Sequence, residues 1–247
     1  GRDRNPSFSV NAAKGVFICH AEGISGGINK LAELLGVESP LRNEMPLPIP
    51  RAKRRQVAAY DYRDTNGALR YQAVKYDPKS FQQRRPDPDK PGGWVWDLKG
   101  VTTIPYRLPE LIRALDNNDI IFVVEGEKDV ENLKAIGLIA TCNHGGAGKW
   151  NEEHSQYFVA GAQVVIVPDN DKPGRDHAAK VADQLIEKGC LVRVVGLPGP
   201  PEKGDISDWL ANGGTKESLL TLVEEAAYYE PGAVAAWPDP EEIQNEL

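Results

Sequence analysis

From Asp119 onward, short apolar runs alternate with segments of helical character, and this alternation restricts the chain to few folds. Four runs have the length of buried strands, and the helical segments between them place apolar residues on one face. The runs are Ile120–Val124, Leu138–Cys142, Gln163–Val167 and Leu191–Leu197. Strands that alternate with helices favour a largely parallel sheet with helices on its faces. We therefore predict an α/β fold with a mainly parallel sheet over residues 119–228.

Residues 55–118 have a different, β-rich pattern. Asn66-Gly67 separates two runs typical of strands, and it is a strong hairpin signal because both residues tolerate a positive φ. Between Arg51 and Arg107 there are 13 Lys and Arg against 6 Asp and Glu, a balance of +7. Because the whole chain has a net charge of −7, the remainder carries −14. We predict a smaller basic subdomain suited to a phosphate backbone, with ordinary surface charge as the alternative.

The two ends of the chain give weaker signals. Residues 1–38 contain two short apolar runs and the helical stretch Ile28–Leu35, which predict a small hairpin followed by a helix. The proline-rich segment 39–54 and the acidic tail 229–247 are predicted linkers. Because the first residue is Gly1 and the only methionine is Met45, we expect this sequence to be a piece of a longer protein.

The composition predicts a soluble, cytoplasmic protein. Apolar residues make up 40% and charged residues 26%, and no apolar run approaches the roughly 20 residues of a membrane span. Cys19, Cys142 and Cys190 are odd in number and lack paired spacing. This argues against a disulfide framework and fits a reducing compartment. We expect no membrane partner.

Acidic residues follow the ends of the predicted strands. Glu125 comes directly after the first strand, Asp169 and Asp171 follow the third, and Asp205 and Asp208 follow the fourth. Functional groups in such sheets collect at the carboxyl ends of the strands. Clustered carboxylates repel one another unless a cation lies among them, and Mg²⁺ and Mn²⁺ favour carboxylate oxygens. The pattern therefore predicts a site for one of these divalent metals.

Each acidic segment also has a simpler interpretation. Asp169-Asn170-Asp171, which precedes Pro173-Gly174, has the composition of a turn with a helix cap. Either Asp205 or Ser207 could cap the helix around Trp209. Glu125-Gly126-Glu127 could be a surface turn. The combination of several acids at successive strand ends favours the metal site over these alternatives.

At these residues the chain resembles the Toprim domain shared by bacterial-type primases, topoisomerases and some nucleases. The segment from Val123 to Asp129 is similar to the first motif of the family, and Asp169-Asn-Asp171 is similar to its Asp-x-Asp motif. The resemblance covers about residues 120–210. It implies that Glu125, Asp169 and Asp171 are catalytic and metal-associated. It also implies that Asp205 and Asp208 are the further acidic pair of primase-type members.

The resemblance extends upstream of this domain. Trp94–Val101 and Pro105–Glu110 are similar to the segment that precedes Toprim in phage- and plasmid-type primases and primase-helicases. Asn5–Val10 and Gly15–His20 resemble the second half of their zinc-binding domain, but Glu22 stands where the second cysteine of a Cys-x-x-Cys pair would follow Cys19. Zinc normally needs four ligands, and Cys19 with His20 cannot supply them, so we do not expect bound zinc in this segment.

The predicted function is that of a DNA primase catalytic core from a mobile element, which makes short RNA primers on single-stranded DNA with Mg²⁺ or Mn²⁺. Its expected partners are the template, ribonucleotides and a replicative helicase, fused or separate. Residues expected to contact nucleotide or template are Lys75, Arg84, Arg85, Lys128, Asp129 and Lys149. Trp94 and Trp96 could stack on bases, but we favour a place in the core for both.

Two other functions remain open from the sequence. A Toprim nuclease or nickase would use similar carboxylates to cleave rather than extend a strand. A non-catalytic module would bind only nucleic acid or another replication protein. The upstream primase-like segment argues against the first, and the intact acidic residues argue against the second.

Overall fold

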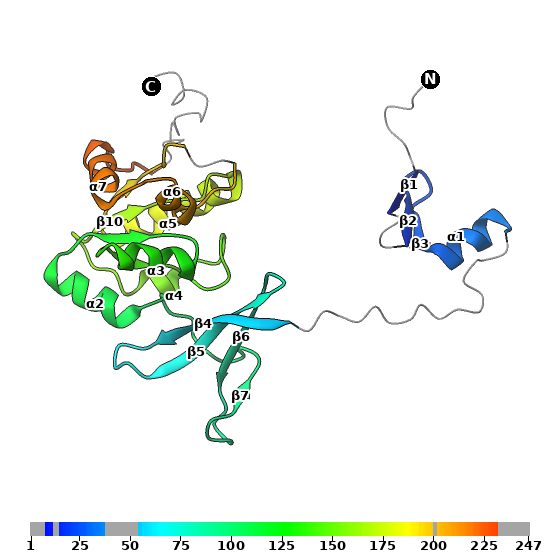
Figure 1. The fold of residues 1–247 in the computed structure, drawn as a ribbon, viewed down its shortest axis with the longest axis horizontal. Helices are drawn as coiled ribbons and strands as arrows, with labels where there is room; N and C mark the ends of the chain where they lie inside the picture. The colour runs from blue at the N-terminus through cyan, green and yellow to red at the C-terminus, as the bar shows by residue number, and fades with distance from the viewer. Residues whose placement is uncertain (1–7, 12–14, 38–53, 200–201, 232–247) are drawn as a thin grey trace. The chain divides into compact units, whose positions relative to one another are not determined.

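The computed structural model describes residues 8–11, 15–37, 54–199 and 202–231, and it divides the chain into two compact units, 1–53 and 54–247 (Figure 1). The predicted linker at 39–54 lies outside the described residues except for its last residue. The predicted tail at 229–247 lies outside them beyond residue 231.

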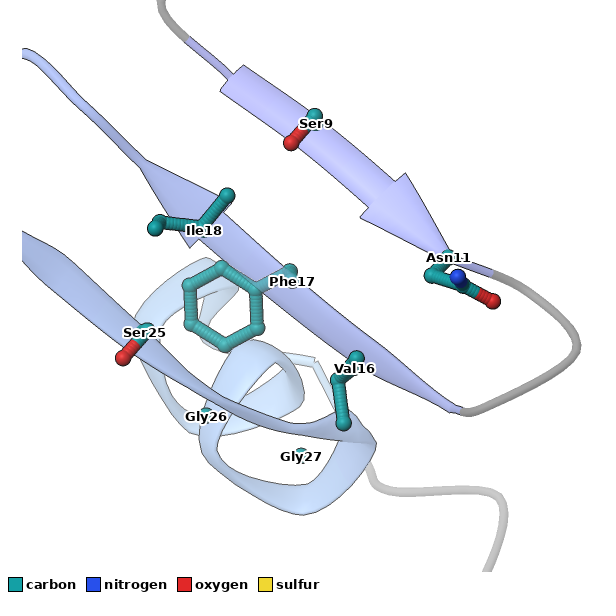
Figure 2. Close-up of a pocket in the computed structure, with 8 residues that line it drawn as sticks. All are labelled: Ser9, Asn11, Val16, Phe17, Ile18, Ser25, Gly26 and Gly27. Atoms are coloured by element: carbon teal, nitrogen blue, oxygen red, sulfur yellow. The ribbon is translucent and has the colours of Figure 1, made fainter. Parts of the chain in front are cut away.

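The first unit is a three-stranded antiparallel sheet with one helix. The strands β1 (Phe8–Asn11), β2 (Val16–Cys19) and β3 (Ile24–Gly27) are adjacent in that order, and α1 (Ile28–Leu35) follows. The predicted hairpin and helix are present, and a third strand, β3, lies between them in the sequence. Phe17 and Ala32 are buried. Figure 2 shows an open pocket on this sheet, lined by Ser9, Asn11, Val16, Phe17, Ile18, Ser25, Gly26 and Gly27.

The second unit begins with a four-stranded antiparallel sheet. It contains β4 (Arg55–Arg63), β5 (Leu69–Asp77), β6 (Ser80–Pro86) and β7 (Trp94–Val95), which are neighbours in sequence order. The β4–β5 turn follows from its residues: Gly67 has a φ of +82° and its N–H donates to the Asp64 carbonyl at 2.8 Å. The predicted hairpin at Asn66-Gly67 is therefore confirmed.

The rest of the second unit is the predicted α/β fold. Its parallel sheet has the order β11-β10-β8-β9, with β8 (Ile121–Val123), β9 (Ile139–Thr141), β10 (Gln163–Ile166) and β11 (Leu191–Val194). The helices around it, visible in Figure 1, are α2 (Leu108–Asn117), α3 (Glu127–Ala135), α4 (Glu152–Ser155), α5 (Lys172–Glu187), α6 (Ile206–Ala211) and α7 (Lys216–Glu225). The expected mainly parallel sheet flanked by helices is confirmed.

One hydrophobic core joins both sheets of the second unit. Tyr62 and Tyr71 of the antiparallel sheet stack at 4.4 Å between ring centroids and belong to the same buried cluster as Ile121 and Phe122 of β8. Beyond α7, the N–H of Tyr229 donates to the Val192 carbonyl at 2.8 Å, so the start of the predicted tail lies along β11. In the described part of the chain, no helix combines the length and apolar character needed to cross a membrane.

Candidate active site

Glu125 and Asp169 meet because their strands are neighbours. Val123 of β8 lies beside Ile166 of β10 in parallel register, so both strands end at the same edge of the sheet. The backbone N–H of Asp169 donates to Oε1 of Glu125 at 3.3 Å. We call Glu125, Asp169, Asp171 and Asp205 the acidic edge. A carboxylate from one strand end is thus held by the backbone of the other.

Gly174 in the first turn of α5 allows this close approach. A Cβ at this position would lie 2.5 Å from Oε1 of Glu125 and 2.6 Å from the carbonyl oxygen of Asp169. Asp171 caps the same helix, since its Oδ1 accepts the N–H of Gly174 at 2.8 Å. Sequence analysis assigned no role to Gly174. The signal in the sequence was its position directly after Pro173 and a few residues after Asp169 and Asp171, where a glycine would let the helix start approach these acids closely.

Burial and mutual repulsion disfavour the charged forms of the acids at the acidic edge. Burial, and after it the charges of Glu125, Asp129, Asp205 and Asp171, raise the pKa of Asp169 to about 8. The pKa of Glu125 is also raised, chiefly by burial and then by neighbouring acids. A divalent cation would favour the charged forms of these groups, so the chemistry of the donor set fits Mg²⁺ or Mn²⁺. Among the described residues, however, no three His, Cys, Asp or Glu side chains are grouped as a metal site.

Asp205 and Asp208 form a reciprocal cap at the start of α6. Oδ1 of Asp205 accepts the Asp208 N–H at 2.8 Å, and Oδ2 of Asp208 accepts the Asp205 N–H at 3.2 Å. The charge of Asp205 still acts on Asp169, and Nζ of Lys128 lies 3.8 Å from its Oδ2. The helix-cap interpretation therefore describes Asp171 and Asp205 correctly, and their caps fix them beside the other acids.

Asp129 lies inside the protein rather than at its surface. It is 6% exposed, and its Oδ1 accepts a short hydrogen bond from the hydroxyl of Ser207. Nδ2 of Asn132 donates to the same hydroxyl oxygen at 2.6 Å. Burial is the main reason that the pKa of Asp129 rises to about 6. In this structure Asp129 ties α3 to α6.

Glu127 and Tyr62 form a link that sequence analysis missed. The Tyr62 hydroxyl on β4 donates to Oε1 of Glu127 at 2.8 Å, and both side chains are buried, Glu127 being 7% exposed. Burial raises the pKa of Glu127, although this hydrogen bond acts in the opposite direction. The contact spans 65 residues of sequence, so no local pattern could have revealed it. It connects the antiparallel sheet to the segment that carries Glu125.

The predicted basic contacts are divided between the two faces of the β4–β7 sheet. Lys75 pairs with Phe81 and shares a face with Tyr71, which pairs with Tyr62. Arg84 pairs with Gln72 and therefore lies on the opposite face. Adjacent strand residues alternate, so Arg85 lies on the Lys75 face, where its Nε is 3.2 Å from Oδ1 of Asp97.

Trp94 and Trp96 do not belong to the core. Trp94 is half-buried and Trp96 is 48% exposed, and the Arg84 guanidinium lies over their rings at 4.0 and 5.2 Å from the centroids. The expectation that both tryptophans lie in the core was wrong. Their alternation shows that they share one face of the strand, but it does not show whether an apolar layer or a cation covers that face.

Lys149 lies exposed in a glycine-rich loop after β9. Gly145, Gly146 and Gly148 all have positive φ, and the N–H of Gly148 donates to Nδ1 of His177 at 3.0 Å. Lys128 is half-exposed at the start of α3. Both lysines remain accessible, whereas Trp150 beside the loop is fully buried.

Comparisons with known proteins agree with this architecture. Residues 122–210 match a family model described as Toprim-like. A search of curated proteins gave no match. The solved structure of the Aquifex aeolicus primase, with zinc-binding and RNA polymerase domains, is 15% identical. It covers 93% of this chain and 77% of that chain, with a TM-score of 0.53.

A DNA primase domain from Pseudomonas aeruginosa is 22% identical and covers 69% of this chain and 51% of that chain, with a TM-score of 0.50. A structure of the DnaG catalytic core is 21% identical and covers 69% and 52%, with a TM-score of 0.49. The match to this chain therefore spans about half the length of these two primase structures.

Residues 122–210 are a Toprim-like domain, as the parallel sheet and the acidic edge indicate. With the antiparallel sheet that precedes it, this domain gives the chain the fold of the Aquifex aeolicus and Pseudomonas aeruginosa primase structures. The resemblance to Toprim primases seen in the sequence is confirmed at this level.

Proposed function

We propose that this chain is the catalytic core of a DNA primase, which joins ribonucleotides on a single-stranded DNA template. One observation carries the proposal: Glu125 and Asp169 are brought together at the carboxyl edge of a Toprim-like sheet. The basic β4–β7 sheet, linked to that edge through Tyr62 and Glu127, supports a nucleic-acid substrate. The fold shared with primase structures supports polymerase rather than nuclease chemistry.

Asp169, Asp171, Glu125 and Asp205 would hold Mg²⁺ or Mn²⁺, which when bound would neutralise charge on the triphosphate and favour in-line attack. Asp208 is the remaining predicted metal ligand, and it would contribute its carboxylate from α6. Where it does not hold a metal ion, Glu125 would accept a proton from the attacking hydroxyl, since the Asp169 N–H orients its carboxylate.

Lys128 would bind phosphate from the edge of the site, where it is half-exposed and already paired with Asp205. Lys75 and Arg85 share the sheet face of Tyr62 and would contact template or nucleotide there, while Lys149 would do so from its loop. Asp129 would act from the interior by positioning α6. We further propose a phage- or plasmid-type context, a helicase partner and a cytoplasmic location.

A primer-synthesis assay tests the proposal. The protein is incubated with single-stranded DNA, labelled ribonucleotides and Mg²⁺ or Mn²⁺, beside Asp169→Asn and the control Asp176→Asn. Asp176 is exposed on α5, the helix that Asp171 caps, and pairs with Lys172 at 2.7 Å, so its loss should leave activity unchanged. Short labelled products that vanish only in Asp169→Asn are expected. Cleaved template would favour a nuclease, and binding without either product would favour a non-catalytic module.

A further inference from the structure

Arg84 on β6 is fixed by residues from the other three strands of its sheet. Its Nε donates to Oε1 of Gln72 on β5 at 2.7 Å. Nε2 of Gln72 in turn donates to Oδ1 of Asp61 on β4 at 2.5 Å. The guanidinium then lies 4.0 Å from the ring centroid of Trp94 on β7. This cross-strand chain holds a flexible side chain in one orientation before any ligand arrives.

Trp96 completes this arrangement at the surface. The Arg84 guanidinium lies 5.2 Å from its ring centroid, and 48% of the residue is exposed. The indole therefore has a fixed cation on one side and solvent-accessible surface elsewhere. We call Arg84, Trp94 and Trp96 the tryptophan platform.

The platform lies on the sheet face opposite Lys75 and Arg85. The register places Arg84 beside Gln72, and the alternation of a strand sends neighbouring side chains to opposite faces. Lys75, in contrast, is close enough to Glu127 for its charge to lower that pKa. The two faces can therefore act separately: one near the segment that carries Glu125, and one away from it.

The chemistry of the platform suits unpaired bases. Single-strand binders combine cationic groups along the backbone with aromatic rings on which bases stack, and every base offers a π face. Arginine is well suited to such a site because its planar guanidinium stacks on aromatic rings while it binds phosphate. The surrounding segment from Arg51 to Arg107 has a balance of +7, so the local charge attracts a polyanion.

We propose that the tryptophan platform binds single-stranded nucleic acid, with Trp96 stacking on a base and Arg84 holding the adjacent phosphate. The inference rests on the proposed function and adds a second contact for the template, on the sheet face away from the acidic edge. Because that face is separate from the chemistry, the platform contributes to affinity and not to the rate of primer synthesis at saturating DNA.

Binding of a labelled single-stranded oligonucleotide to Trp96→Leu and Trp96→Phe tests this inference. Leucine keeps an apolar contact with the sheet but removes the π face, whereas phenylalanine keeps one. We expect Trp96→Leu to weaken binding by about 5- to 150-fold and Trp96→Phe to recover most of the loss. The slope of affinity against salt should not change, because no phosphate contact is removed.

Tyr228→Leu is the matched control. Tyr228 is 49% exposed, and the guanidinium of Arg193 lies 4.0 Å from its ring centroid, but it is outside the basic sheet. Its loss should leave affinity unchanged. Thermal unfolding of all three variants checks that each remains folded.

The inference is overturned if Trp96→Leu binds as tightly as the wild type, or if Trp96→Phe is as weak as Trp96→Leu. A reduced salt slope in Trp96→Leu would also contradict it. Failure of the wild type to bind would remove this inference together with the nucleic-acid substrate. Binding that depends on Trp96 in a protein that makes no primers would retain the platform and reject the primase proposal.

Discussion

The acidic edge and the β4–β7 sheet place their charged residues in different ways. At the acidic edge, strand ends and helix caps bring together carboxylates from three segments, and backbone N–H groups orient them. On the β4–β7 sheet, side chains pair across strands, and register alone decides which face receives Arg84 and which Arg85. The first arrangement concentrates like charges at one point, and the second distributes cations over two faces.

This difference has a consequence for stability. The acids repel one another and are partly buried, which is unfavourable until a cation binds. The cations of the sheet are instead compensated by Asp97, Gln72 and tryptophan rings. We therefore expect substitutions at the acidic edge to change stability and activity in opposite directions. Substitutions of the cations and tryptophans of the sheet should change affinity with little effect on stability or activity.

Gly174→Ala should have the largest effect. Alanine normally stabilises a helix relative to glycine by about 1 kcal/mol, but this Cβ would lie 2.5 Å from Glu125 Oε1 and 2.6 Å from a backbone oxygen. We expect a loss of about 1–3 kcal/mol in the free energy of unfolding. Displacement of Glu125 should lower primer synthesis by about 100-fold. Denaturant unfolding and the synthesis assay measure the two effects.

Asp176→Ala is the control for that substitution, since it changes an exposed residue two positions further along α5. It should alter stability by less than about 1 kcal/mol and leave activity intact. If Gly174→Ala instead stabilises the protein and retains activity, the close packing of α5 against the acidic edge is refuted.

Tyr62→Phe breaks the connection between the two regions. It removes the hydroxyl that donates to the buried Glu127 and should cost about 1–3 kcal/mol, because a desolvated acceptor loses a partner. Activity should fall as well, because Glu127 follows Glu125 by two residues. Unfolding and activity are measured beside Tyr76→Phe, a half-buried tyrosine on the neighbouring strand whose ring, not hydroxyl, contacts Arg54. If the two variants have the same stability and activity, the hydrogen bond between Tyr62 and Glu127 contributes to neither.

The sequence predicted the acidic edge better than it predicted the basic sheet. Strand ends can be predicted from apolar runs, and the carboxyl ends of parallel strands lie at the same edge of a sheet. The proximity of Glu125 and Asp169 could therefore be predicted from the sequence. The α/β fold and the Asn66-Gly67 hairpin followed from equally local signals. Each of these depends on a pattern only a few residues long.

The residues that escaped prediction depend on long-range contacts. Tyr62 reaches Glu127 across 65 positions, and Ser207 reaches Asp129 across 78. Register between β5 and β6 separates Arg84 from Arg85, although they are adjacent in sequence. The role of Gly174 requires knowing what lies against it. Local patterns carry no information about such neighbours.

Asp169→Asn should stabilise the protein in the absence of divalent metal. The amide has nearly the same shape as the carboxyl but never carries a charge. The substitution therefore removes the cost that burial and four neighbouring acids impose on the ionisable group when the chain folds. We expect a gain of about 1 kcal/mol at neutral pH, after allowance for solvent screening. Thermal unfolding with EDTA measures it. Added Mg²⁺ should raise the midpoint of the wild type more than that of the variant. If the variant is less stable than the wild type without metal, the Asp169 carboxyl makes contacts that stabilise the metal-free protein, and the prediction is wrong.

The smallest effects are expected from the two neighbouring arginines, which test the separation of the sheet faces. Arg85→Ala removes one cation and a surface ion pair, so stability should change by less than about 1 kcal/mol. If Arg85 contacts a phosphate, the slope of log affinity against log salt should fall by about 0.7. Arg84→Lys keeps the charge but loses the planar stack on Trp94, so affinity should fall with the slope unchanged. Titrations at several salt concentrations distinguish these outcomes, and identical slopes for both variants would mean that the two faces bind nucleic acid in the same way.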